Sequence, residues 1–383
     1  MSDPNTGGPT QGQPIGGPAA AWSGPSTVPA PQRPRDGRFI TMIVSGVLAV
    51  ALCIVALSLP VPYVIESPGP TFNTLGKDSG KPVIQVSGHQ TFPADGQLDL
   101  VTVSVSGGPN SNVNVVEAYR AWLDSSRSVI PEELLYPPGT SQQEISSQNA
   151  VAMTTSQEDA TAAALTQLKI PFDTTLAVAA IPEGSASQGQ LEPGDVLVSI
   201  DGTPITYIKV IQDALAGGNG KAISMEVRRG SDLLTKTIIP QKSTAGKYLL
   251  GIALQNNFKF PFDVNISLSN VGGPSAGMMF ALGIIDTVTS GDLTGGKHFA
   301  GTGTIDPAGN VGAIGGIAQK MIGARQSGAT VFLAPAANCG EVVGHVPAGL
   351  QVVRVATLQQ AEDAVAQIAA GQNDPALPTC TAG

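Results

Sequence analysis

Residues 39–59 constrain the fold of this chain most strongly, because they run from Phe39 to Leu59 without a charged side chain. A helix rises about 1.5 Å per residue, so a run of this length can cross a hydrocarbon core of about 30 Å. A cleaved signal peptide is the alternative, but the run is longer than a typical signal core and a long polar stretch precedes it. The sequence therefore predicts one transmembrane helix over 39–59.

The charges beside this run predict its orientation. Arg33, Arg35 and Arg38 precede it, whereas the first charge after it is Glu66. Positive residues favour the cytoplasmic side of a span, so we expect a cytoplasmic N-terminus and an extracytoplasmic location for everything after residue 60. Residues 1–36 are rich in Pro and Gly with almost no large apolar side chains, and we expect a disordered tail there.

Composition excludes several functions. The formal net charge is −9 with only 20 Lys and Arg, so the chain lacks the basic surface that nucleic-acid binding requires. The cysteines and histidines match no zinc or metalloprotease spacing, and we expect no metal and no cofactor. An extracytoplasmic location permits a disulfide between Cys339 and Cys380, while two free thiols remain an equal alternative.

Residues 176–245 have the texture of a small separate module. Short apolar strands alternate with turns, and a short helix is expected over 207–216. The segment Leu191-Glu-Pro-Gly-Asp-Val-Leu-Val-Ser-Ile-Asp-Gly-Thr-Pro-Ile205 resembles a bacterial PDZ domain. The resemblance implies binding of extended peptides or C-termini by strand addition. A small α+β module without a ligand is the alternative.

The segment 270–277, Asn-Val-Gly-Gly-Pro-Ser-Ala-Gly, leads directly into the apolar run 278–285. Pro274 and Ser275 are good helix-opening residues, which predicts Ser275 in the first helical turn. Backbone N–H groups at a helix start favour developing negative charge, as a serine nucleophile requires. A glycine-rich turn capped by a serine is the structural alternative.

A helix is predicted over 317–326, ending before Gly328. Ile317, Met321 and Ala324 form its apolar stripe, and Lys320 lies at the border of that stripe. A lysine drawn toward a buried face has a lowered pKa and can act as a general base. A lysine whose ammonium group reaches water is the alternative.

Taken together, these segments resemble the proteolytic domain of Lon proteases. Gly-Pro-Ser275-Ala-Gly is followed by Gly-Gly-Ile-Ala-Gln-Lys320, with Thr302-Gly-Thr-Ile between them and residues 331–338 after them. The resemblance implies that Ser275 is the nucleophile, Lys320 the base and Thr302 a residue that orients the lysine. We assign the oxyanion donors to the backbone of Gly273, Ser275 and Ala276. One departure is Gly272, where Lon commonly has an acidic residue.

The predicted fold class is α+β: a Lon-type proteolytic domain with an inserted PDZ-like domain, preceded by one transmembrane helix. The first protease part covers 83–170, with a strand near 98–105 and a helix opened by Ser156. The second part covers 248–370, and 371–383 is expected to be a frayed tail. Residues 63–70 are expected to be a connector, and 107–150 receive no assignment.

The sequence thus predicts a membrane-tethered serine endopeptidase that cleaves protein or peptide substrates. The nearest match to a phosphate loop, residues 291–298, has His298 where Ser or Thr should bind Mg²⁺, so we expect ATP-independent activity. The resemblance alone implies a homo-oligomeric ring. Two alternatives stay open: a non-catalytic PDZ adaptor on a pseudoprotease body, and an α/β-hydrolase-type esterase that uses Ser275 and His345.

Overall fold

A computed structural model describes residues 37–109, 113–205, 208–244, 246–269, 271–371 and 377–381. The tail predicted over 1–36 lies outside the described residues, as do Tyr207 and Asn270. The chain divides into two compact units, with the division between Ala56 and Leu57.

Helix α1 (Gly37–Ser58) contains the apolar run. Among the described residues it is the one helix long and apolar enough to cross a membrane, and none of its side chains is buried by protein. It begins two residues before the predicted span and ends one residue before its predicted end.

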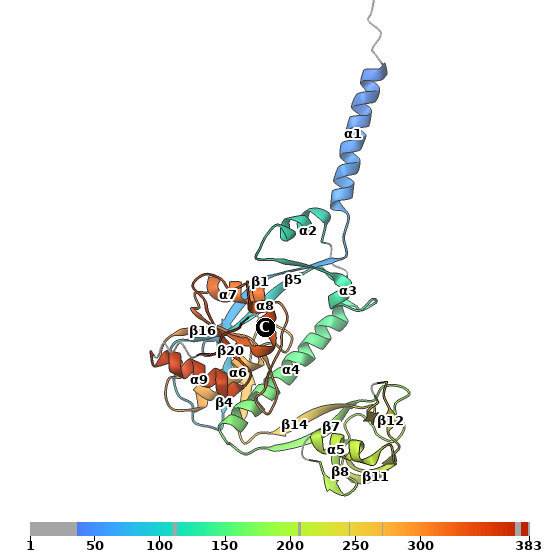
Figure 1. The fold of residues 1–383 in the computed structure, drawn as a ribbon, viewed down its shortest axis with the longest axis vertical. Coiled ribbons are helices and arrows are strands. Elements are labelled where there is room, and N and C mark those ends of the chain that lie inside the picture. The colour runs from blue at the N-terminus through green and yellow to red at the C-terminus, as the bar shows by residue number, and fades with distance from the viewer. Residues whose placement is uncertain are drawn as a thin grey trace, which may run out of the picture. The chain divides into compact units, whose positions relative to one another are not determined.

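A mixed sheet forms the centre of the second unit, with the strand order β20-β19-β16-β5-β1-β6. Its strands are β1 (Tyr63–Asn73), β5 (Gln97–Ser106), β6 (Ser128–Pro131), β16 (His298–Gly301), β19 (Val331–Pro335) and β20 (Gln351–Val355). The ladders from β5 through β16 and β19 to β20 are parallel, and those of β1 with β5 and β6 are antiparallel. Segments far apart in the sequence therefore share one sheet, as the blue β1 and the orange-red β16 show in Figure 1.

The prediction of a connector over 63–70 is wrong, because these residues belong to β1. Pro68 and Pro70 are tolerated because the β1–β5 register shifts between Pro68 and Thr71. At such a bulge some backbone N–H groups make no ladder hydrogen bond, so a proline, which has no N–H, fits there. The β5 strand predicted near 98–105 is confirmed.

Alternate residues of the sheet face two different cores. Phe299 and Leu333 pack into one cluster with helix α6 (Gly277–Val288) and helix α9 (Leu358–Ala369). Their neighbours Ala300 and Phe332 pack into another cluster with helix α7 (Ile317–Gln326). This two-residue period follows from strand geometry and explains the nearly continuous apolar runs in the sequence.

Helix α4 (Gln142–Gln167) packs on α6 and starts much earlier than predicted. Its N-cap is Ser141, whose hydroxyl accepts a hydrogen bond from the N–H of Glu144, so the capping box expected at Ser156 is wrong. Ser156 lies mid-helix, where its hydroxyl donates to the carbonyl of Pro274 at 3.0 Å. The first turns were missed because they are mostly exposed and polar, without an apolar period.

The remaining elements outside residues 173–259 are short. They are β2 (Lys77–Asp78), β3 (Lys81–Pro82), β4 (Ile84–Ser87), α2 (Val115–Trp122), α3 (Glu132–Leu135), β15 (Asp263–Ile266), β17 (Thr304–Ile305), β18 (Val311–Gly312), the 3-10 helix η1 (Ala336–Asn338) and α8 (Cys339–Val342).

Residues 173–259 form a second sheet with the order β11-β10-β8-β7-β14 and with β9 paired to β8. Its elements are β7 (Asp173–Ala180), β8 (Val196–Ile200), β9 (Thr203–Pro204), α5 (Ile208–Gly218), β10 (Ile223–Arg229), β11 (Asp232–Ile238) and β14 (Ala253–Lys259), with the small hairpin β12 (Gln241–Lys242) and β13 (Tyr248–Leu249). Figure 1 shows β7 and β14 running side by side, and their register pairs Asp173 with Lys259. The module is therefore longer than the predicted 176–245, because β14 closes its sheet.

Asp195 of the PDZ-like motif has a structural role. Its carboxylate is fully buried and accepts two hydrogen bonds from the Arg229 guanidinium, at 2.7 and 2.8 Å. The Arg229 contact lowers the pKa of Asp195. A bidentate pair of this kind holds the turn before β8 against the end of β10.

The C-terminal segment differs from the frayed end that we expected. Cys339 and Cys380 form a disulfide, Leu377 is buried, and the N–H of Arg354 donates to the carbonyl of Pro378 at 2.7 Å. Residues 377–381 are thus held beside β20.

Candidate active site

Ser275 lies in the loop that enters α6. The prediction that it occupies the first helical turn is wrong, since Ala276 is the N-cap and the helix begins at Gly277. Gly273 turns the chain with a φ of +86°, a conformation that other residues rarely adopt. The N–H of Gly303 donates to the Ser275 carbonyl at 2.8 Å, and Ser156 holds the Pro274 carbonyl. These contacts fix the loop on both sides of the half-buried Ser275.

The same loop decides which backbone donors are free. The N–H of Gly273 donates to the carbonyl of Asn149 in α4 at 3.0 Å, so its assignment as an oxyanion donor is wrong. Among the described residues, no acceptor is found for the N–H groups of Ser275 and Ala276, and both residues line the same cavity. A side chain at Gly272 would begin 3.0 Å from the Asn149 Cβ, so this position packs closely on α4.

Lys320 is buried rather than snorkelling, with 2% of its surface exposed. Its Nζ donates to Thr302 Oγ1 at 3.2 Å, and that hydroxyl donates to the Ser275 carbonyl at 3.0 Å. Thr302 is itself fully buried. A continuous chain of hydrogen bonds therefore joins the lysine helix to the serine loop.

Burial lowers the pKa of Lys320 from 10.5 to about 8, because desolvation disfavours the ammonium form. The carboxylate of Glu66 acts in the opposite direction and raises that pKa. Glu66 lies on β1 and is buried, which raises its own pKa. The sequence reasoning did not predict that Glu66 acts on the pKa of Lys320. The signal that could have indicated it is a single charged residue directly after the apolar pair Val64 and Ile65 in a strand.

Ser275 and Lys320 line one cavity of about 420 Å³. Ala276, Gly273 and Met153 contribute to its wall, and residues 101–105 of β5 form one side. The cavity therefore brings together a hydroxyl, a desolvated amine and a strand, which are the components needed for attack on an extended peptide.

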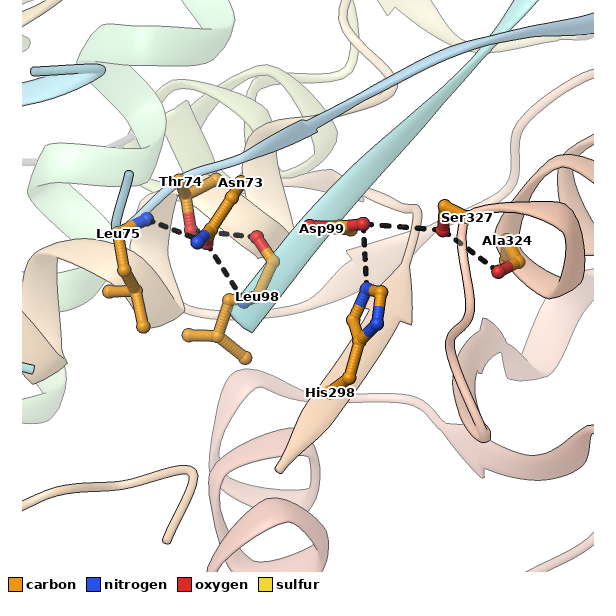
Figure 2. Close-up of polar contacts among 8 residues, drawn as sticks. All are labelled: Asn73, Thr74, Leu75, Leu98, Asp99, His298, Ala324 and Ser327. Carbon is orange, nitrogen blue, oxygen red and sulfur yellow. Dashed lines mark hydrogen bonds and ion pairs between the residues drawn. The ribbon is translucent and has the colours of Figure 1, made fainter. Parts of the chain in front are cut away.

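A second polar cluster lies outside this cavity and resembles a catalytic triad only in composition (Figure 2). Asp99 accepts from His298 Nε2 at 2.8 Å and from Ser327 Oγ at 3.3 Å. In a serine triad the histidine lies between serine and carboxylate, whereas here the carboxylate lies between the other two. Ser327 is the C-cap of α7, so the cluster ties the end of the lysine helix to β5.

Figure 2 also shows how β1 is attached to the start of β5. Asn73 Oδ1 accepts from the N–H groups of Leu75 and Leu98, both at 3.1 Å. Thr74 Oγ1 donates to the carbonyl of Leu98 at 3.0 Å. These side chains fix the turn after β1 on the sheet.

Other candidate groups do not join the cavity. His345, the alternative triad member, is exposed and its Nδ1 contacts the Glu341 carbonyl at 3.0 Å. The described residues that line the cavity include no histidine. No group of three or more His, Cys, Asp or Glu that could hold a metal occurs among the described residues.

Comparison with known families agrees with this architecture. Residues 177–229 match the PDZ domain, and residues 267–369 match the Lon protease C-terminal proteolytic domain. The chain therefore contains a PDZ domain and a Lon-type proteolytic domain. The predicted α+β class, with these two domains and a candidate N-terminal span, is confirmed.

Individual relatives match over short segments. The archaeal Lon protease of Methanocaldococcus jannaschii is 32% identical over 105 residues, which are 27% of this chain and 16% of that protein. A Clostridium perfringens protein, named provisionally as a zinc metalloprotease, is 34% identical over 73 residues, 19% of this chain and 22% of that protein. The matched segments thus span about a fifth or less of these relatives. The PDZ domain of an SdrC-like protein from Listeria monocytogenes has 18% identity and a TM-score of 0.20, covering 21% of this chain and 85% of its own.

Proposed function

We propose that this chain is a membrane-tethered serine endopeptidase in which Ser275 is the nucleophile and Lys320 the general base. The observation that carries the proposal is the buried chain from Lys320 through Thr302 to the Ser275 loop, at the wall of one cavity. With a pKa of about 8, about a tenth of Lys320 is neutral at pH 7, and this neutral amine is the form that a general base requires.

The proposed reaction begins when neutral Lys320 takes the proton of the Ser275 hydroxyl. The Ser275 oxygen attacks the peptide carbonyl carbon, and the negative charge on the carbonyl oxygen is stabilised by the N–H groups of Ser275 and Ala276. Protonated Lys320 then gives its proton to the leaving amine as the C–N bond breaks. Water, deprotonated by Lys320, hydrolyses the acyl-enzyme and returns the serine.

The open edge of β5 supports an extended substrate. β16 pairs with β5 only from Gln97 to Leu100, whereas β1 pairs with it from Asp99 to Ser106. No described strand pairs with residues 101–106 on the side that β16 leaves free, and residues 101–105 line the cavity. A peptide that adds to this edge would present its backbone beside Ser275.

We further propose that the PDZ domain docks substrates. An exposed C-terminus or extended segment bound there would raise the local concentration of substrate near the cavity. Without a nucleotide-binding motif in the sequence, we infer ATP-independent cleavage of segments that are already unfolded. We also propose that α1 spans the membrane with the catalytic domain on the extracytoplasmic side, as the arginines before it favour.

The direct test is labelling by a fluorophosphonate probe together with cleavage of a fluorescently labelled unfolded protein. Ser275→Ala should abolish labelling, and both Ser275→Ala and Lys320→Ala should reduce cleavage by at least about 10³-fold because the two groups act as one unit. Ser87→Ala, at an exposed serine of β4, is the matched control and should retain both signals. Cleavage retained by Ser275→Ala would refute the proposal. A native chain that is folded but neither labelled nor active would favour the alternative of a non-catalytic PDZ adaptor.

A further inference from the structure

Helix α2 exposes an apolar stripe that the protease and PDZ functions leave unexplained. Val115, Tyr119, Trp122 and Leu123 are 36%, 58%, 74% and 64% exposed. Their spacing of four, three and one residues places them on one face of a helix with 3.6 residues per turn. Trp122 is among the most exposed large apolar side chains in the described chain.

An adjacent face of α2 is already used for folding. Ala121 is fully buried and packs with Ile65 and Val113, and Ala118 packs against the same cluster. The helix start is fixed by a capping box in which Asn114 and Glu117 satisfy each other's backbone N–H groups. The exposed stripe is therefore not required to order the helix. An exposed apolar patch of this kind marks a surface that binds another apolar surface.

Chain connectivity favours the lipid bilayer as that partner. Pro60 forms a β-bridge with Asn114, and the N–H of Val61 donates to the carbonyl of Val113 at 2.9 Å. Pro60 is only two residues beyond Ser58, the last residue of α1. Two residues span at most about 7 Å and the β-bridge adds about 5 Å, so the start of α2 is held within roughly 12 Å of Ser58, where the candidate span ends.

The chemistry of the stripe also fits a lipid surface. Trp and Tyr concentrate at the boundary between headgroups and acyl chains, where an apolar ring and a polar edge are both accommodated. The outward charges of α2, Glu117 and Arg120, cancel, so attraction should not depend on anionic lipid. Three side chains of an eight-residue helix and its C-cap Leu123 cannot supply the roughly 1,200 Å² that a stable protein interface buries, which disfavours a second copy of the chain as partner.

We propose that α2 lies in the membrane surface, with Val115, Tyr119, Trp122 and Leu123 inserted at the headgroup–acyl boundary of the bilayer that α1 crosses. This second attachment rests on the proposed membrane anchoring by α1. It fixes the protease body at two points, one spanning and one lying on the surface.

The chain has only two tryptophans, Trp22 and Trp122, so fluorescence can test this directly. Full-length Trp22→Phe protein is reconstituted into zwitterionic phosphatidylcholine vesicles with or without bromine atoms in the upper acyl chain. We expect Trp122 emission that is blue-shifted and strongly quenched by the brominated lipid. Adding Tyr119→Ser and Leu123→Ser should reduce that quenching.

The matched control replaces both tryptophans by phenylalanine and carries Leu233→Trp, at a 59% exposed position of the β11 hairpin. Its emission should be red-shifted and unquenched. Trp122 quenching no greater than in this control would overturn the proposal, as would a blue shift that depends on protein concentration and is the same with and without vesicles. Carbonate extraction of the vesicles separates the proposed α1 span from the proposed surface position of α2. A chain that carbonate removes from the membrane would refute the span. A chain that resists carbonate but shows no Trp122 quenching would refute only the surface position of α2.

Discussion

The sharpest prediction concerns the Lys320 amine and the carboxylate beside it. With a pKa of about 8, about a tenth of Lys320 is neutral at pH 7, against less than about a thousandth for a lysine at its ordinary value of 10.5. If the neutral amine is the base, kcat/KM should rise about tenfold per pH unit below the pKa and level off above it. Activity at pH 6 should therefore be about a hundredth of the plateau.

Glu66→Gln keeps the shape of the side chain and removes its charge. Since ionised Glu66 raises the pKa of Lys320, the substitution should lower that pKa further and move the rising limb to lower pH. Each unit of displacement raises activity at pH 6 about tenfold, provided that the plateau is unchanged. The variant should thus be more active than the native chain in acid and no more active at pH 9.

The assay is kcat/KM for a short unstructured fluorogenic peptide between pH 5 and 10, with circular dichroism at each pH to verify folding. Glu144→Gln, which removes one negative charge from the exposed first turn of α4, is the control and should leave the profile unmoved. A native profile that keeps rising to pH 10, or a Glu66→Gln profile displaced to higher pH, would refute the reasoning.

Four other changes test neighbouring features. Thr302→Val should lower kcat by about 10- to 100-fold through loss of the hydroxyl that holds the Lys320 amine, whereas Thr302→Ser should retain most activity; equal kinetics of the two would show that the hydroxyl is dispensable. Lys320→Met should raise the free energy of unfolding at pH 7 by up to about 3 kcal/mol. The folded-state pKa of about 8 lies below the ordinary value of 10.5, so the native lysine destabilises the fold fully below pH 8, and this penalty fades as the pH rises to 10.5. A variant with no gain in thermal stability would contradict the burial argument. Cys380→Ser opens a disulfide across 41 residues and should lower the free energy of unfolding in denaturant titrations by about 2–4 kcal/mol, with an unchanged midpoint as the contrary result. Removing residues 173–259 and joining the ends by a short linker should leave a folded body that cleaves short peptides, since Asp173 and Lys259 are paired; global unfolding by circular dichroism would count against that.

Elements with a strong local signal were predictable from the sequence. The apolar run of α1, the lysine helix over 317–326 and the PDZ motif around Asp195 each depend on residues close together in the chain. Local signals failed where long-range pairing decides the structure. β1 was interpreted as a connector because Pro68 and Pro70 disfavour an isolated strand, yet two neighbouring strands hold it in the sheet.

The candidate site was only partly predictable for the same reason. Sequence resemblance pointed to Ser275, Lys320 and Thr302, and the structure places all three at or beside one cavity. The electrostatic role of Glu66 and the engagement of the Gly273 N–H depend on partners more than a hundred residues away. No local pattern encodes such contacts.

The order in which the sheet strands occur along the chain has a consequence for biosynthesis. β5 ends at Ser106, but its parallel neighbour β16 begins at His298, after the whole PDZ domain. A ribosome working from the N-terminus therefore completes α1 and the PDZ domain before it supplies the Ser275 loop and helix α7. Slow, long-range strand pairing then closes the sheet last. Under the proposed function, a nascent or truncated chain would be anchored and would bind peptides, but it would not cleave them until the final third of the protein has been made.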